Sequence, residues 1–391
     1  MKTPIPTEGA GTDVREDPAV LLDATSVPQL RGGVGRYVDH LAAALAAAGV
    51  RLTVVCQQRD VEIFGGLAPG SRVVAVHRRW RSRAGRMIWE QAAFPRLISR
   101  LAVDVVHSPH YTMPLASPVP VVVTLHDATF FSHRALHLGV KGRFFRSWTR
   151  ISLRRAARCV VPSRATADQL QRHLRVRPNV IQVAHHGVDQ RVFHPPAEAD
   201  IAELTDTLSL TGRTWIAFLG TLEPRKNVPA LIRGYIKAFS GRVDAPVLVL
   251  AGAAGWDKDI EPALSAVPEE LSVIRPGHLP IESLPALLGG SMLVCYPSLG
   301  EGFGLPVLEA MACRSTVLTT RRLSLPEVGG DAVAYCGVQD EQIAGALGEL
   351  AADPQSRRRL ADAAVKRAAG FTWQASAGEH LKAYRHAVGS R

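Results

Sequence analysis

Cysteine is scarce in this chain, which has only five among its 391 residues. The count is odd, the spacing is wide, and there is neither a Cys-x-x-Cys pair nor a histidine cluster at the spacing of metal ligands. A disulfide-stapled fold and a structural zinc site are therefore disfavoured. We expect reduced thiols, and hence a cytoplasmic protein, from Cys56, Cys159, Cys295, Cys313 and Cys336.

Long hydrophobic runs are also missing. The most apolar stretch, Leu41 to Val50, has ten residues, about half of the roughly 20 that a membrane-spanning helix needs. The N-terminus has Lys2, but prolines and acidic residues follow it in place of the apolar segment of a signal peptide. We therefore predict a disordered tail over residues 1–18 and no transmembrane helix.

Acidic residues are few in the first half of the chain. Residues 1–195 hold 27 Lys and Arg against 13 Asp and Glu, a net charge of +14, whereas residues 196–391 hold 19 against 22, a net charge of −3. Such an excess favours an anionic partner: nucleic acid, a membrane surface or a phosphorylated acceptor. No helix-turn-helix, zinc-finger or RNP-like motif is present, so a basic nucleic-acid-binding protein is the less favoured alternative.

Short apolar runs alternate with turns and helical patterns along the chain, which predicts parallel sheets covered by helices on both faces. The length and the 47% apolar composition suit two such domains. This alternation of strand and helix patterns is interrupted at Phe193-His194-Pro195-Pro196 and then resumes. We therefore predict one domain over residues 19–195 and a second over residues 196–374. The predicted strands are Ala19 to Leu22, Leu52 to Cys56, Asp104 to His107, Val119 to Leu125, Cys159 to Pro162, Trp215 to Leu219, Val247 to Ala251, Leu271 to Ile274 and Leu293 to Tyr296.

A glycine turn, Gly32-Gly33-Val34-Gly35-Arg36, lies between the first strand and an alanine-rich helix predicted from about Val34 to Ala48. Glycines there let the N–H groups of a helix N-terminus approach an anion. The spacing is not Gly-x-Gly-x-x-Gly, and no acidic residue closes the following strand to hold a ribose. An NAD-dependent oxidoreductase is therefore disfavoured.

Two further strand-to-helix turns carry charged groups. In Gly220 to Asn227, the adjacent cations Arg225 and Lys226 can neutralise charge on a departing diphosphate. In the segment from Pro297 to Ala312, Pro306 suits a first helical turn, with Glu301 in the preceding loop and Glu309 on that helix's first turn. Carboxylates at both ends and free amides between them suit a ligand with hydroxyls at its ends and phosphate in the middle.

The pair Glu301 and Glu309 forms a Glu-x7-Glu pattern. Together with the glycine turn, the Arg-Lys turn and Leu125-His126-Asp127, it resembles family 4 of the retaining GT-B glycosyltransferases. The resemblance runs in order from about Val20 to Trp373. It includes Trp89-Glu90-Gln91, Val161-Pro162-Ser163, Gly187-Val188-Asp189 and Leu325-Pro326-Glu327-Val328.

This resemblance implies the fold and a separate role for each of its two domains. The fold would be α/β of the GT-B type, with two Rossmann-like, doubly wound domains facing a central cleft. Residues 19–195 would form the acceptor-side domain, and residues 196–374 would bind the nucleotide sugar. A C-terminal helix over residues 375–391 would pack back on the first domain.

The resemblance also implies roles, residue by residue. Glu301 would contact hydroxyls of the donor sugar, Arg225 and Lys226 the diphosphate, and Glu309 the ribose hydroxyls. His126 would be the active-site histidine beside the transferred sugar. The remaining donor contacts would come from the backbone, at Gly33, Phe303, Gly304 and Leu305.

The reaction so implied is the retaining transfer of a hexose to a hydroxyl of a glycan or lipid-linked acceptor. Mannose from GDP-mannose is the favoured donor, because Glu223 to Asn227 and Trp89-Glu90-Gln91 resemble the mannosyltransferase branch. The alternative is a UDP-sugar or another NDP-sugar in cell-surface polysaccharide or natural-product glycosylation. We expect no cofactor and no metal. Asp257-Lys258-Asp259 has the Asp-x-Asp form of metal-dependent transferases of another fold, but it suggests a surface turn.

Two arginine-rich segments stand apart from these motifs. The first is Arg78-Arg79-Trp80-Arg81-Ser82-Arg83. In the second, arginines from Arg143 to Arg158 would share one stripe of a helix, opposed by Phe144, Trp148 and Ile151. The alternatives are a solvated face of an ordinary amphipathic helix and a contact with anionic lipid at the inner face of the plasma membrane.

Overall fold

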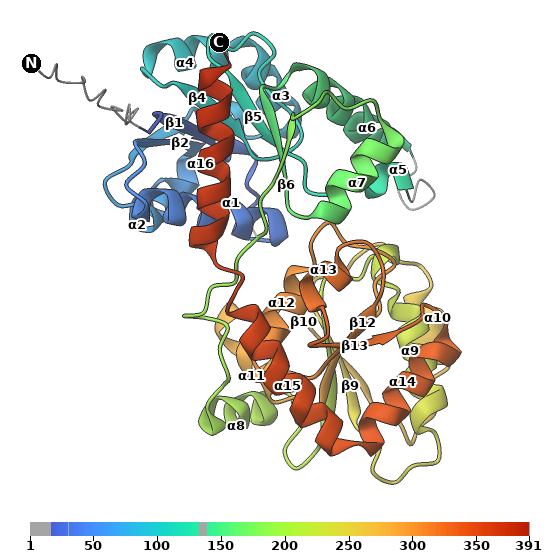
Figure 1. Ribbon diagram of the computed structural model, residues 1–391. Coiled ribbons are helices and arrows are strands. Elements are labelled where there is room, and N and C mark those ends of the chain that lie inside the picture. Colours follow the sequence, from blue (N-terminus) through green and yellow to red (C-terminus); the bar gives the residue numbers. More distant parts are fainter. Residues whose placement is uncertain (1–16, 30, 133–138, 391) are drawn as a thin grey trace, which may run out of the picture.

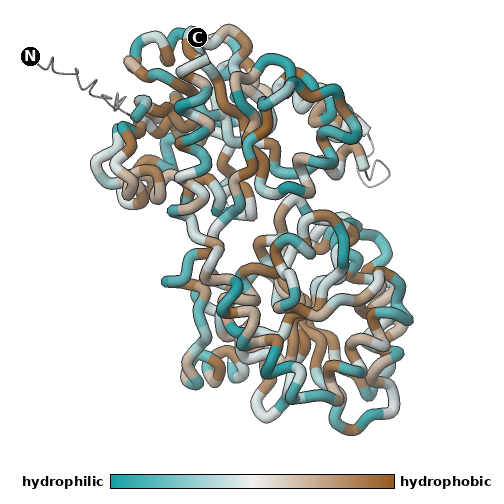
Figure 2. Tube along the Cα trace, in the orientation of Figure 1, coloured by the Kyte–Doolittle hydropathy of each residue, from teal (hydrophilic) through white to brown (hydrophobic). Residues whose placement is uncertain are grey.

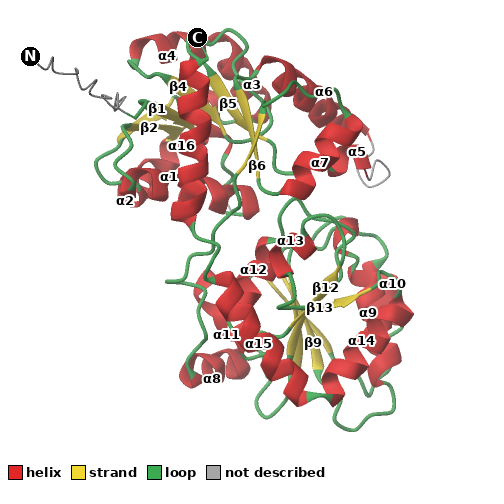
Figure 3. Ribbon diagram, in the orientation of Figure 1, coloured by secondary structure: helices red, strands yellow, loops and turns green. Residues whose placement is uncertain are grey.

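The computed structural model describes residues 17–29, 31–132 and 139–390. It shows two α/β lobes joined by two chain segments (Figure 1), each lobe built on one sheet with helices on both faces (Figure 3). The prediction of two doubly wound α/β domains is confirmed. The predicted tail over residues 1–18 lies, apart from Asp17 and Pro18, outside the described residues.

The N-terminal sheet has seven strands in the order β3-β2-β1-β4-β5-β6-β7, and every neighbouring pair is parallel. The strand order reverses between β1 and β4, so the loops that leave these strands open a crevice at their carboxyl ends. The strands are β1 (Val20–Asp23), β2 (Leu52–Gln57), β3 (Arg72–Val76), β4 (Val105–Ser108), β5 (Val121–Thr124), β6 (Arg158–Val161) and β7 (Ile181–Val183).

Alternate residues of the central N-terminal strands pack on opposite faces of the sheet. Leu21 belongs to one hydrophobic cluster, while Val20 and Leu22 belong to the other. Burial on both faces explains why these strands are continuous apolar runs. The covering helices are α1 (Gly33–Ala47), α2 (Val61–Leu67), α3 (Arg83–Ala92), α4 (Phe94–Arg100), α5 (Thr129–Ser132), α6 (Gly139–Arg155) and α7 (Arg164–His173).

The C-terminal sheet has six parallel strands in the order β10-β9-β8-β11-β12-β13, again with a reversal, here between β8 and β11. Its strands form the apolar centre of the second lobe (Figure 2). The strands are β8 (Trp215–Leu219), β9 (Val247–Ala251), β10 (Val273–Gly277), β11 (Leu293–Tyr296), β12 (Val317–Thr320) and β13 (Ala334–Cys336). The helices are α8 (Glu198–Thr207), α9 (Val228–Phe239), α10 (Ile260–Ser265), α11 (Leu284–Gly289), α12 (Leu305–Ala312), α13 (Leu325–Gly329), α14 (Asp340–Ala352) and α15 (Pro354–Ala368).

The last helix, α16 (Trp373–Gly389), runs along the N-terminal lobe (Figure 1). It contacts α1 and β6, and its Trp373 and Tyr384 side chains join the hydrophobic cluster on that face of the sheet. The two connecting segments touch where the Val188 N–H donates to the Phe371 carbonyl at 3.1 Å. The end of the chain therefore completes the core of the first lobe.

The sequence-based assignment differs from the structure in two ways. It omits β3, β7, β12 and β13. Three of these are edge strands; β7 and β13 have three residues each, and β3 is only partly buried. The arginine stripe was also wrong in part, because α6 ends at Arg155 and Arg158 begins β6. Phe145 and Leu153, rather than Phe144 and Ile151, pack on the core.

Candidate active site

Arg225 and Lys226 lie in a short 3-10 turn (Pro224–Lys226) between β8 and α9, at the carboxyl end of the C-terminal sheet. The turn ends at Asn227, whose φ of 59° is left-handed. The Asn227 side-chain amide donates to the carbonyls of Pro297 and Val338 at 3.3 and 2.9 Å. These contacts fasten the cationic turn to the loop that follows β11.

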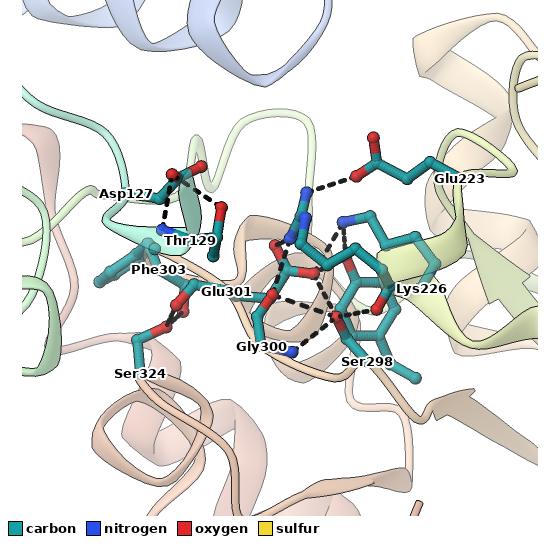
Figure 4. Close-up of polar contacts among 12 residues, drawn as sticks. Asp127, Thr129, Glu223, Lys226, Ser298, Gly300, Glu301, Phe303 and Ser324 are labelled. Atoms are coloured by element: carbon teal, nitrogen blue, oxygen red, sulfur yellow. Dashed lines mark hydrogen bonds and ion pairs between the residues drawn. The ribbon is translucent and has the colours of Figure 1, made fainter. Parts of the chain in front are cut away.

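The carboxylate of Glu301 is the centre of this site (Figure 4). One oxygen accepts from Lys226 Nζ at 2.8 Å, from Ser298 Oγ at 2.6 Å and from Tyr296 Oη at 3.1 Å. The other oxygen forms an ion pair with Arg225. Lys226 also donates to the Tyr296 hydroxyl. Two loops that are some 75 residues apart in the chain are thereby joined by a buried cluster of charges.

The charges in this cluster stabilise one another. Burial acts to raise the pKa of Glu301, but the charges of Arg225 and Lys226 outweigh it and lower the pKa to about 2. Burial, assisted by the Arg225 charge, lowers the pKa of Lys226. Arg225 is further paired with Glu223 at 2.5 Å and donates to the Gly300 carbonyl at 2.8 Å. The result is a preorganised cluster at the end of β8, in which two cations are paired with two carboxylates.

The loop between Glu301 and α12 presents backbone N–H groups. Gly304 precedes the helix with a φ of 103°, a left-handed conformation that favours glycine. The Ser324 hydroxyl contacts the carbonyls of Glu301 and Phe303 at 2.8 Å each, which holds this loop in place. The Leu305 N–H, at the start of α12, has no acceptor within the helix and suits an anion, whereas Pro306 has no N–H and the Val307 N–H donates to the Gly304 carbonyl at 3.0 Å.

Glu309 lies on α12, in its second turn and not in its first as the sequence suggested, because the helix begins at Leu305. Its carboxylate is 3% exposed. Arg36 of α1, in the opposite lobe, reaches it with Nη1 at 2.5 Å from Oε1. Gly33 begins α1, and a side chain at that position would point into open space.

His126 follows β5 on the N-terminal side of the cleft. Its Nε2 donates to the Pro109 carbonyl at 2.6 Å, which leaves Nδ1 as the unprotonated nitrogen. Burial lowers the pKa of this imidazole, so the ring is neutral near pH 7. Tyr37 packs edge-on against it, with ring centroids 5.0 Å apart. Asp127 accepts from the Thr129 N–H and hydroxyl, so it caps α5 (Figure 4).

The two lobes meet at Gly302, directly after Glu301. The Gly302 carbonyl accepts from the hydroxyls of Ser163, the N-cap of α7, and of Thr166 on α7, at 2.6 and 3.1 Å. A Cβ atom at Gly302 would lie 1.9 Å from the His126 carbonyl oxygen, so only glycine permits this approach. Nearby, Glu327 of α13 accepts from the backbone amides of Arg164 and Ala165 and pairs with His185 at 2.6 Å.

The structure therefore brings the sequence-selected residues to one place between the lobes. Glu301, Arg225 and Lys226 are in direct contact. The carbonyl of His126 faces Gly302 across the cleft, and Glu309 faces the start of α1. Their roles in catalysis remain predictions. The sequence did not assign roles to several side chains that complete the site, namely Arg36, Ser163, Thr166, Tyr296, Ser298 and Glu327.

Among the described residues, no group of three or more His, Cys, Asp or Glu side chains could hold a metal ion. Asp257 accepts from the Asp259 N–H at 3.1 Å just before α10, as in a surface turn. In the described parts of the chain, no helix is both long and apolar enough to cross a bilayer.

Comparison with solved structures identifies the architecture. Anabaena Alr3699/HepE in complex with UDP and glucose superposes with a TM-score of 0.72 at 16% identity, covering 93% of this chain and 98% of that one. WaaG, a glycosyltransferase involved in lipopolysaccharide biosynthesis, superposes with a TM-score of 0.73 at 16% identity over the same shares. The fold is that of the GT-B glycosyltransferases.

Sequence comparison identifies the family within the GT-B glycosyltransferases. The model for Glycosyltransferase Family 4 matches residues 31–192, and that for Glycosyl transferases group 1 matches residues 200–367. The chain belongs to family 4 of the GT-B glycosyltransferases. O-antigen chain mannosyltransferase B of Escherichia coli is 26% identical over 90% of this chain and 96% of its own length. Alpha-maltose-1-phosphate synthase of Mycolicibacterium smegmatis is 28% identical over 92% and 96%.

Proposed function

We propose that this glycosyltransferase moves mannose from GDP-mannose, with retention of configuration, to a hydroxyl of a glycan or lipid-linked acceptor. The observation that carries the donor chemistry is the convergence of Arg225 and Lys226 on Glu301, beside the N-terminus of α12. The choice of mannose is supported by the similarity to the O-antigen chain mannosyltransferase over nearly the whole of both chains.

In this proposal, Arg225 and Lys226 bind the diphosphate and stabilise the charge that grows on it as the bond to the sugar breaks. Amides of Phe303, Gly304 and Leu305 bind the same anion or sugar hydroxyls, and Gly33 approaches it from the N-terminal lobe. The Glu301 carboxylate accepts hydrogen bonds from hydroxyls of the sugar while it remains paired with Arg225 and Lys226. These groups replace the charge that a metal ion would supply.

In this proposal retention follows a front-face route, because the site carboxylates are engaged otherwise: Glu301 is paired with Arg225 and Lys226, and Glu309 with Arg36. The bond between the anomeric carbon and the phosphate oxygen breaks while the acceptor oxygen attacks from the same face. The acceptor proton passes to an oxygen of the leaving diphosphate. His126 lies beside the transferred sugar and orients it; as a neutral imidazole, it does not repel the developing positive charge on the ring.

A second candidate donor is a UDP-sugar or another NDP-sugar, because the relatives of this chain act on different substrates. A D-inositol 3-phosphate glycosyltransferase from Arthrobacter is 28% identical over 91% of this chain. A thermal-shift panel of GDP-mannose, UDP-glucose, ADP-glucose and a dTDP-sugar tests the choice. Stabilisation by GDP-mannose alone, followed by mannose transfer, supports the proposal. Stabilisation by a different nucleotide overturns it.

We also propose that the enzyme is a cytoplasmic protein that binds anionic membranes peripherally, as a lipid-linked acceptor would require. Exposed arginines at 78, 79, 81, 83 and 143 lie within five residues in the chain of an exposed apolar residue, Ile88 of α3 (59% exposed) or Val140 of α6 (75% exposed), or in the segment that leads into α3. Basic residues near an anionic surface contribute about 1 kcal/mol each.

Vesicle sedimentation tests this membrane proposal. Binding should need anionic lipid and fall with salt. It should weaken when Arg143, Arg146 and Arg150 are changed to Ser, but not when Arg358, Arg359 and Lys366 of α15 are changed to Ser as a matched control. Wild type that stays in the supernatant at low salt contradicts the proposal.

A further inference from the structure

The side chain of Arg36 bridges the two lobes. Arg36 lies in the first turn of α1, directly after the glycine turn, and its guanidinium is 2.5 Å from the Glu309 carboxylate of α12. The arginine and glutamate side chains are 18% and 4% exposed. This ion pair therefore forms inside the cleft, where solvent screens it little.

The position of Arg36 is unfavourable for α1 itself. A cation in the first turn opposes the positive end of the helix dipole, and this turn holds no acidic residue that would offset it. Helix stability therefore does not explain an arginine here. Its charge is balanced instead by Glu309, from the other lobe.

The ionised state of Glu309 in turn depends on the charge of Arg36. Burial raises the pKa of Glu309, and the Arg36 charge opposes that rise. The Cys313 thiol at the C-cap of α12 also interacts with this carboxyl, but burial raises the pKa of the thiol, so that it stays neutral. Without Arg36, a carboxyl buried this deeply takes up a proton more readily.

One carboxylate oxygen of Glu309 remains available. Arg36 occupies Oε1, whereas Oε2 is buried and has no hydrogen-bond partner among the described residues. A buried carboxylate oxygen without a donor is costly, and a ligand hydroxyl would satisfy it. Gly32 and Gly33, at the start of the turn before Arg36, face open space, so a ligand can approach from that side.

We propose that Arg36 is a donor-site residue contributed by the N-terminal lobe, which holds Glu309 as an oriented carboxylate whose second oxygen accepts the ribose hydroxyls of the nucleotide. This inference rests on the proposed function. Because the ion pair spans both lobes, the ribose contact reaches full strength only when the lobes are together. Nucleotide binding and closure of the cleft are therefore coupled.

The test combines a protein variant with a ligand that lacks the relevant hydroxyls. Affinities of GDP and 2′,3′-dideoxy-GDP are measured by calorimetry at pH 6 and pH 8.5 for wild type and Arg36→Gln. Arg36→Lys keeps the charge. Arg191→Gln is the matched control, since its side chain is 83% exposed and pairs with Asp189 instead.

In wild type, GDP should bind roughly tenfold more tightly than the dideoxy compound at both pH values. In Arg36→Gln, this preference should shrink toward one, and more so at pH 6 than at pH 8.5, because a buried carboxyl without its cation takes up a proton more readily at the lower pH. Arg36→Lys should keep much of the preference, and Arg191→Gln all of it. The inference is overturned if Arg36→Gln keeps the wild-type preference at both pH values or binds GDP more tightly. Wild type that binds no nucleoside diphosphate refutes the proposed function instead.

Discussion

Replacement of Glu301 by Gln tests whether the buried charge cluster supports both the fold and the function. The change keeps the size of the side chain but removes the negative charge that pairs with Arg225 and Lys226. Both cations are then left buried without this partner. Breaking a buried ion pair in this way costs about 3 to 5 kcal/mol of folding free energy.

The lowered pKa of Glu301 gives a similar value for the folding free energy that the ion pairs contribute. A fall from the ordinary value of 4.5 to about 2 corresponds to about 3 kcal/mol, at about 1.4 kcal/mol per pKa unit. Because the folded pKa lies below the unfolded one, this stability is fully present above pH 4.5 and is lost as the pH falls toward 2. The wild type should therefore exceed Glu301→Gln in stability at pH 7, and by less at pH 3.

Calorimetry of the thermal transition of the C-terminal domain measures this difference. For a domain of this size, about 3 kcal/mol corresponds to a fall in Tm of roughly 6 to 12 °C. Glu341→Gln is the control, because Glu341 is an exposed partner of Lys237 and a surface pair contributes less than about 1 kcal/mol. Equal Tm values for wild type and Glu301→Gln at pH 7 would refute the reasoning.

The same variant separates binding from transfer. Glu301 shares Arg225 and Lys226 with the diphosphate, and removal of its charge leaves both cations more attractive to the ligand, so Glu301→Gln should bind GDP at least as tightly as wild type does. Transfer should fall, because the sugar loses a charged acceptor for its hydroxyls. Weaker GDP binding together with normal turnover would contradict the assigned roles.

Three further predictions concern the cleft. His126→Ala should leave GDP affinity nearly unchanged and lower transfer by roughly a hundredfold through misplacement of the sugar; wild-type turnover would remove His126 from the site. Gly302→Ala should lower turnover at least roughly tenfold without a change in the Tm of the C-terminal domain, because the added methyl meets the His126 carbonyl oxygen at 1.9 Å; normal turnover would show that close approach is not required. Activity should survive EDTA, since Arg225, Lys226 and helix amides supply the charge; a loss that magnesium or manganese restores would implicate Asp257 and Asp259.

The degree of burial explains which elements could be predicted. The strand predicted over Trp215 to Leu219 agrees with β8, because both faces of this strand are covered and its apolar run is continuous. β3 lies at the edge of its sheet with Arg72 and Ala75 exposed, so its short apolar run from Val73 to Val76 is only partly buried and gives a weaker signal. The arginine helix was misassigned for a related reason. Helical periodicity continued through Arg158 in the sequence, but the chain there begins β6 and pairs with β5.

The residues of the candidate site also fall into those that the sequence could predict and those that it could not. Glu301, Arg225 and Lys226 could be selected from the sequence because each lies in a short strand-to-helix turn with characteristic residues. Arg36 also lies in such a turn, but its partner Glu309 comes from a helix in the other lobe, 273 positions away. Local spacing cannot predict a contact that depends on how two lobes approach one another.

The sequence alone determined which groups are available: alternating apolar runs for two parallel sheets, glycines at strand-to-helix turns, and a set of cations and carboxylates in those turns. These features are local, since periodicity and turn chemistry act over a few residues. The tertiary structure decided which charges meet. It paired Glu301 with Arg225 and Lys226, Glu309 with Arg36, and the Gly302 carbonyl with Ser163, because only the packed lobes bring these groups within hydrogen-bonding distance and away from water.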